Sequence, residues 1–132
     1  MARSDIRTRR VDSIGLVELV GEHDVATTTE LQDALDGVFA PGAAVVVDLS
    51  AATFIDSSVL GVLLRAEIRT SRGRGDQFAV VAPKGSAAAA LFDLVDARHT
   101  CFATFESVDD AVESCAAGTA GAARREVAAT PD

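Results

Sequence analysis

An acid and two hydroxyls, Asp56, Ser57 and Ser58, stand between two runs of aliphatic side chains in the segment Phe-Ile-Asp-Ser-Ser-Val-Leu-Gly. The residue pattern changes there from strand-like to helical, so a helix is expected to begin at Ser57. A serine at a helix N-cap accepts a backbone N–H, and the unpaired N–H groups and the helix dipole favour an anion such as a phosphate. The segment therefore fits either a plain helix cap or a serine that is phosphorylated.

A third interpretation makes Ser57 a nucleophile that uses His23 as its base. The Gly-x-Ser-x-Gly elbow of hydrolases is absent, and the chain contains only 2 histidines. We interpret His23 as a loop residue and expect no catalytic residue, so a serine hydrolase is the last of the three interpretations.

The composition narrows the classes of partner. A formal net charge of −8 disfavours nucleic acid and anionic membranes, and the absence of Trp and Tyr argues against a platform for stacked bases. The 2 cysteines, Cys101 and Cys115, show neither metal-binding spacing nor a disulfide framework. We therefore expect no metal, no cofactor, no membrane partner and a cytoplasmic location.

The order of the expected elements predicts an α/β fold. A first hairpin is followed by alternating helices and strands, which predicts a single domain with a four- to five-stranded, mainly parallel (mixed) sheet flanked by helices. The domain is expected over residues 1–117 and a flexible C-terminal tail over residues 118–132. Strands are expected at 6–11, 16–20, 44–49, 78–82 and 101–105, and helices at 27–40, 57–71, 86–97 and after Ser107.

Two local details of the helices follow from spacing. Thr27 and Glu30 have the spacing of a capping box at the start of the first helix. The helix from Ser57 carries more apolar residues than one contact with the sheet needs, so one apolar arc is expected to remain for a partner. That arc consists of Val59, Val62, Leu63 and Ala66.

Three segments carry a resemblance to a known family. They are Gly-Glu-His-Asp at residues 21–24, Val-Val-Val-Asp-Leu-Ser-Ala-Ala-Thr-Phe-Ile-Asp-Ser-Ser-Val-Leu-Gly at 45–61 and Ser-Ala-Ala-Ala-Ala-Leu-Phe-Asp-Leu-Val-Asp at 86–96. In order and spacing the chain resembles the STAS domain family, specifically the bacterial anti-sigma factor antagonists, from about residue 5 to 117. The resemblance implies phosphorylation at Ser57. The expected partner-binding residues are Gly21, Glu22, His23, Asp24, Asp56, Ser57, Ser58, Val59, Val62 and Arg65.

The resemblance also implies a mode of action without catalysis. The unmodified form would bind an anti-sigma factor that is also a serine kinase, which frees a sigma factor and regulates transcription. Phosphorylation would end the binding, a PP2C-type phosphatase would restore it, and the protein would be a monomer or weak dimer. One residue departs from the family pattern Asp-Ser-Ser-Gly-Leu-Gly, because Val59 replaces the first glycine. Alternatives within the family are a non-phosphorylated scaffold of the stressosome type and a lipid-transport accessory subunit.

Overall fold

The computed structural model describes residues 4–40, 42–71, 77–95 and 102–116. The expected tail at 118–132, the expected helix end at Gly73 and Gly75, and Cys101 lie outside the described residues. The elements are β1 (Asp5–Val11), β2 (Ile14–His23), the 3-10 turn η1 (Val25–Thr27), α1 (Thr28–Val38), β3 (Ala44–Asp48), β4 (Ala52–Ile55), α2 (Ser57–Ser71), β5 (Gln77–Val81), α3 (Ala87–Val95), β6 (Ala103–Phe105) and a helix over 108–116.

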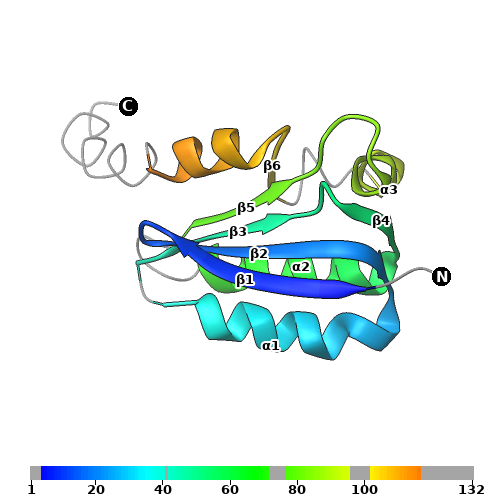
Figure 1. Ribbon diagram of the computed structural model, residues 1–132, viewed down its shortest axis with the longest axis horizontal. Coiled ribbons are helices and arrows are strands. Elements are labelled where there is room, and N and C mark those ends of the chain that lie inside the picture. The colour runs from blue at the N-terminus through cyan, green and yellow to red at the C-terminus, as the bar shows by residue number, and fades with distance from the viewer. Residues whose placement is uncertain (1–3, 41, 72–76, 96–101, 117–132) are drawn as a thin grey trace.

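The strands form one six-stranded mixed sheet in the order β1-β2-β3-β5-β6, and β4 pairs with β2 beside this path (Figure 1). β1 and β2 are antiparallel, whereas the other pairs are parallel. The expected α/β class and the mainly parallel sheet are confirmed, with one strand more than expected. The additional strand is β4, which the sequence did not indicate because Thr53 and Phe54 are exposed and interrupt any buried run.

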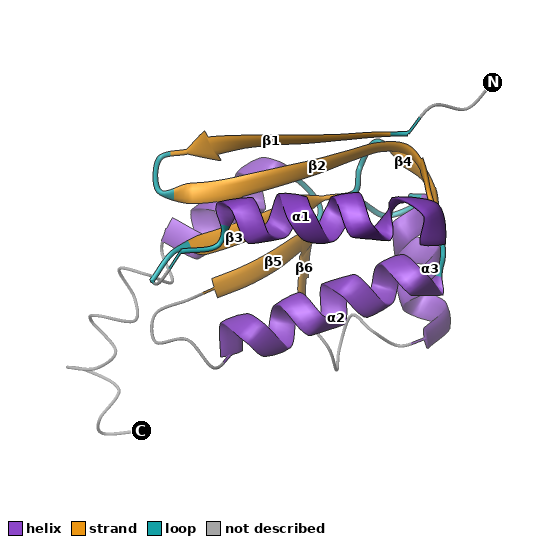
Figure 2. Ribbon diagram, turned by 90° about the horizontal axis from the view of Figure 1, so that it is seen from below, coloured by secondary structure: helices purple, strands orange, loops and turns teal. Residues whose placement is uncertain are grey.

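Helices cover both faces of the sheet. Figure 1 shows α1 and α2 on one face and the helix over 108–116 on the other, and Figure 2 shows α1 and α2 side by side. All five residues of β3 are buried, as expected for a strand that is covered on both sides. Val45 and Val47 point into the core beneath α1 and α2, while Val46 packs toward the helix over 108–116.

The start of α1 differs from the expected capping box. The Thr27 hydroxyl does not bond an N–H of the first turn; it contacts the backbone oxygen of Asp24 at 3.2 Å and the His23 ring at 3.1 Å. Because η1 runs directly into α1, the Thr27 N–H already has a partner in the Asp24 carbonyl at 3.0 Å. The 3-10 turn therefore replaces the side-chain cap, and its own cap is Asp24, which accepts the Ala26 N–H at 2.9 Å.

Gly15 sets the spacing between β2 and the end of α1. A Cβ atom at Gly15 would stand 2.7 Å from the Cβ of Val38, a separation that real Cβ atoms do not show. The buried Val38 side chain therefore packs directly against the backbone of β2. By contrast, nothing lies within 4 Å of a Cβ built at Gly37, one residue earlier on α1.

These two glycines make a matched pair for a stability test. Gly15→Ala is expected to lower the free energy of unfolding by about 1–3 kcal/mol, because Val38 must move out of a packed core. Gly37→Ala is expected to raise it by about 0.5–1 kcal/mol, because alanine is the better helix former. Urea unfolding followed by circular dichroism measures both, and equal effects of the two changes would contradict the close β2–α1 packing.

Candidate functional site

The site begins where β2 changes its partner strand. β2 pairs with β3 through residues 14–18 and with β4 through residues 21–23, and the register shifts between Gly21 and Glu22. Gly21 has a φ of 87°, in the region that favours glycine, and its N–H donates to the Ala51 carbonyl at 3.0 Å. The bulge at Gly21 thus lets β4 lie beside the end of β2, which brings the Gly-Glu-His-Asp segment next to the start of α2.

Asp56, and not Ser57, caps α2. Its carboxylate accepts the N–H of Ser58 at 3.0 Å, the N–H of Val59 at 3.3 Å and the Ser58 hydroxyl. Its backbone carbonyl accepts the Leu60 N–H at 3.2 Å, the first bond of the helix. The expectation that Ser57 is the N-cap is therefore wrong by one residue. A carboxylate oxygen can accept several donors at once, whereas Ser57 is already the first residue of the helix and therefore lies past the cap position.

The two serines differ in what surrounds their hydroxyls. The Ser58 hydroxyl is engaged with Asp56, and the residue is half-buried. Ser57 is exposed, and none of the described residues forms a hydrogen bond with its hydroxyl. Of the pair, Ser57 therefore presents the more accessible oxygen.

His23 is a structural residue, contrary to the expectation of a loop residue that faces a partner. It is the last residue of β2 and is 0% exposed. Its Nε2–H donates to the Val20 carbonyl at 2.9 Å, and its Nδ1 contacts the Thr27 hydroxyl at 3.1 Å. Both ring nitrogens are thus engaged inside the fold, which leaves His23 unable to serve Ser57 as a base.

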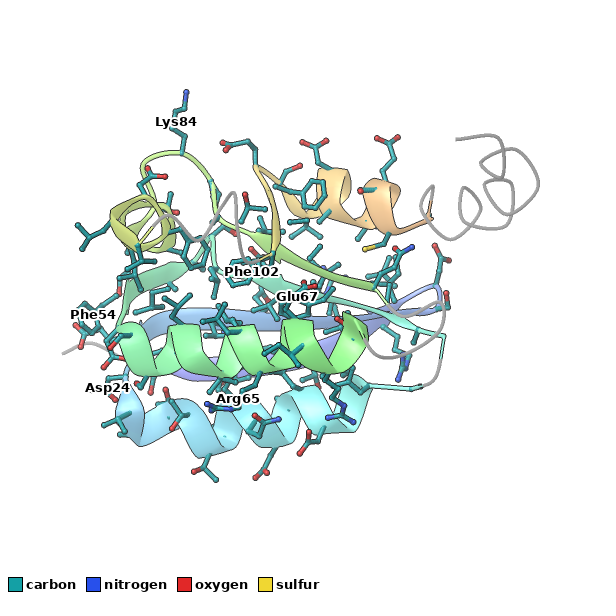
Figure 3. The ribbon with its side chains drawn as sticks, turned by 180° about the vertical axis from the view of Figure 1, so that it is seen from behind. Asp24, Phe54, Arg65, Glu67, Lys84 and Phe102 are labelled. Carbon is teal, nitrogen blue, oxygen red and sulfur yellow. The ribbon has the colours of Figure 1, made fainter. Side chains whose placement is uncertain are left out.

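Acidic side chains surround the start of α2. Glu22 and Asp24 flank the buried His23 and are both exposed, because alternate residues of an extended segment point to opposite sides. The hydrogen bond from the Ser58 hydroxyl, helped by the N–H groups of Val59 and Ser58 and opposed by burial, lowers the pKa of Asp56. The carboxylates of Glu22, Asp24 and Asp56 therefore lie at the end of the sheet next to the start of α2, where Ser57 stands. Figure 3 shows Asp24 at this end of α2.

The apolar arc of α2 that was expected to face a partner belongs to the core. Val59 and Leu63 are 0% exposed, and Val62 is 1% exposed. Ala66 is buried with them in the cluster beneath the helices. The opposite side of α2, with Ser57, Gly61, Arg65 and Ile68, is the one left at least partly open to solvent. Val59, the departure from the family glycine, therefore fills the core and adds no side chain to the surface.

Two exposed apolar residues, one in η1 and one in β4, were not expected from the sequence. Val25 is 71% exposed in η1, and Phe54 is 48% exposed in β4, where it pairs with Glu22 (Figure 3). A signal did exist for Phe54, because it precedes the buried Ile55 in an extended segment and must point the other way. No group of His, Cys, Asp or Glu in the described part of the chain could hold a metal ion. Within the same residues, no helix is long and apolar enough to cross a membrane.

The chain belongs to the STAS domain family, whose model matches residues 5–111. A search of curated proteins found no match.

Among solved structures, the chain is similar to an anti-sigma factor antagonist from Mycobacterium paratuberculosis, with 29% sequence identity and a TM-score of 0.75 over 86% of this chain and 94% of that one. A protein from Thermotoga maritima shares the fold, with 18% identity and a TM-score of 0.68 over 83% of this chain and 93% of that one. The anti-sigma factor antagonist SpoIIAA in its unphosphorylated form also shares it, with 14% identity and a TM-score of 0.58 over 86% of this chain and 99% of that one.

The position of the cap can be tested by substitution. Asp56→Ala is expected to lower the free energy of unfolding by about 1 kcal/mol, because the first-turn N–H groups lose their acceptor. Ser57→Ala is expected to change it by less than about 0.5 kcal/mol, as for an ordinary surface position. Urea unfolding at pH 7 measures both changes. A larger loss of unfolding free energy for Ser57→Ala than for Asp56→Ala would show that Ser57 is the N-cap.

The lowered pKa of Asp56 also predicts a dependence on pH. The ionised carboxylate stabilises the folded state, so its contribution is complete above the unfolded pKa of about 3.9 and disappears as the pH falls through the lower folded value. Asp56→Asn keeps an oxygen acceptor but cannot ionise. The stability difference between the parent chain and Asp56→Asn should therefore shrink from pH 6 toward pH 3, as measured by thermal melting, and a constant difference would contradict the assignment.

Proposed function

We propose that this chain is an anti-sigma factor antagonist whose binding to an anti-sigma factor is switched by a phosphate on Ser57. The proposal rests on the different surroundings of the two serines. Ser57 has an exposed hydroxyl, whereas the hydroxyl of Ser58 forms a hydrogen bond with Asp56. Membership of the STAS family and the similarity to the Mycobacterium paratuberculosis antagonist support the choice of partner.

The proposed cycle has two chemical steps. In the first, the anti-sigma factor acts as a serine kinase: the γ-phosphoryl group of ATP moves to the Ser57 oxygen, the hydroxyl loses its proton, and ADP leaves. In the second, a PP2C-type phosphatase uses water to cleave the bond between phosphorus and oxygen, which restores the hydroxyl and releases inorganic phosphate. The chain itself supplies no catalytic group, and its part is to present the hydroxyl.

Charge repulsion and desolvation together explain why a phosphate on Ser57 would end binding. The group adds about −1.5 to −2 charge at neutral pH. It would join the exposed carboxylates of Glu22 and Asp24 and the ionised Asp56 at the end of the sheet. A partner that docks there must remove water from all these charges, and the free energy of that desolvation rises with each added charge.

The surface around Ser57 also offers the apolar area that binding needs. Phe54 and Val25 stand on two segments that flank the start of α2, and both are exposed. Aromatic side chains in the centre of an interface often contribute more than 1 kcal/mol each, and a rim of polar groups keeps water away from them. We therefore propose Phe54, with Val25, as the apolar centre of the partner surface, in place of the buried Val59 and Val62.

The identity of the phosphorylated residue can be tested with an anti-sigma factor kinase from the same cells. Incubation with the kinase and ATP, followed by mass spectrometry, should place one phosphate on Ser57 in the parent chain and in Ser58→Ala, and none in Ser57→Ala. Ser57→Ala should still bind the anti-sigma factor. Modification of Ser57→Ala but not of Ser58→Ala would overturn the residue assignment, and an unmodified parent chain would favour a scaffold that is not phosphorylated.

The partner surface can be tested at Phe54. Phe54→Thr keeps a residue that suits a strand, and it should weaken binding of the anti-sigma factor at least about tenfold, which corresponds to ~1.4 kcal/mol. Its circular dichroism and melting should stay close to those of the parent chain. Val62→Glu is the contrasting variant, since a carboxylate at this 1% exposed position should unfold the protein. Unchanged affinity in folded Phe54→Thr would remove Phe54 from the surface.

A further inference from the structure

The side chain of Arg65 lies along α2 and covers Gly61, which has no side chain of its own. A Cβ atom built at Gly61 would have the Nη1 of Arg65 3.6 Å away, which is ordinary van der Waals contact. Gly61 precedes Arg65 by four residues, so the arginine side chain runs back toward the start of the helix. Figure 3 shows Arg65 on the side of α2 that faces α1. The absence of a side chain at Gly61 thus leaves the space in which the guanidinium lies.

The space over Gly61 adjoins Ser57. Residues four apart on a helix have Cβ atoms about 5–6 Å from each other, so the Gly61 position is the helical neighbour of Ser57. Because Arg65 Nη1 lies 3.6 Å from the Cβ position of residue 61, the guanidinium lies beside the helical neighbour of Ser57. A phosphate on Ser57 that turned along the helix toward Gly61 would approach this guanidinium.

The partners of Arg65 differ from those of two other arginines. Two other arginines of the described chain form ion pairs, Arg7 with Asp5 at 2.8 Å and Arg69 with Asp36 at 2.7 Å. Arg69 additionally lies over the Phe39 ring at 4.2 Å. Arg65 is exposed, and none of the described residues forms an ion pair or hydrogen bond with it.

We propose that Arg65 is the internal counter-charge of a phosphate monoester on Ser57, held in place because Gly61 leaves the helix surface open between them. The proposal rests on the proposed phosphorylation of Ser57 and deepens its regulation. Arginine suits this role, because its planar guanidinium bonds two phosphate oxygens at once. Phosphorylation would then change the partner surface in two ways: it adds negative charge, and it withdraws from the partner the guanidinium that the unmodified surface presents.

The other charged groups near the phosphate act in the opposite sense. Asp56 precedes Ser57, and Glu22 and Asp24 lie on the adjoining segment, so all three disfavour a second negative charge on the phosphate. On α1, Asp36 already pairs with Arg69 of α2 at 2.7 Å. Among the described residues of α2, Arg65 is therefore the cation placed to lower the second pKa of the phosphoserine.

The experiment installs phosphoserine at position 57 during translation, so that neither a kinase nor a partner is needed, and follows its second pKa by phosphorus NMR. Arg65→Gln should raise that pKa by about 0.2–0.4 unit, the size of an ion pair on a helix surface. Arg69→Gln removes the same charge one turn farther along α2 and should move it by less than about 0.1 unit, because screening weakens distant charges.

Gly61→Gln tests whether the open space at position 61 matters when the charge of Arg65 is kept. It keeps Arg65 but fills the space over the helix, so it should raise the second pKa about as much as Arg65→Gln does, and 1 M salt should reduce both shifts. Equal effects of Arg65→Gln and Arg69→Gln would overturn the counter-charge, and an unchanged pKa in Gly61→Gln would overturn the role of the open position. Because the phosphate is installed without a kinase, these results are independent of whether the cell phosphorylates Ser57.

Discussion

The arrangement of the site depends on one strand that serves two partners. β2 pairs with β3 along its first half and with β4 at its end, and the left-handed backbone of Gly21 makes the change possible. The same strand thus holds both β3 and β4, and β4 leads directly into α2. The pairing is what places the acidic residues at the end of β2 beside the serines that begin α2.

Polar contacts inside the fold stabilise the region where the end of β2 meets β4 and the start of α2. His23 bridges the Val20 carbonyl and the Thr27 hydroxyl in the interior, and Asp56 gathers three donors at the start of α2. A similar contact set ends β3, where the Asp48 carboxylate accepts the N–H of Ser50 at 3.0 Å and its hydroxyl. With the inward-facing polar groups satisfied in this way, Ser57 projects from a backbone that its neighbours fix on both sides.

The sequence indicated most of the fold but not the orientation of its parts. α2 begins where expected, and β3 was evident as a β-branched run, since both features depend on local pattern. β4 was missed because half of its residues are exposed. The apolar arc of Val59 and Val62 was assigned to the wrong side because a helical wheel shows which residues share a face but not which face meets the sheet. The cap was misplaced because Asp56 and Ser57 are both good N-cap residues, and only the folded structure shows which side chain accepts the N–H groups.

β1 ends the strand order, and within the described residues no strand pairs with its outer edge. An open edge of this kind is where two copies of a chain can join into a continuous sheet and aggregate. β1 carries exposed Arg7, Arg9 and Arg10, and two such strands aligned with each other would bring like charges together. The charges along β1 therefore disfavour a fibre-like extension of the sheet from one copy to the next.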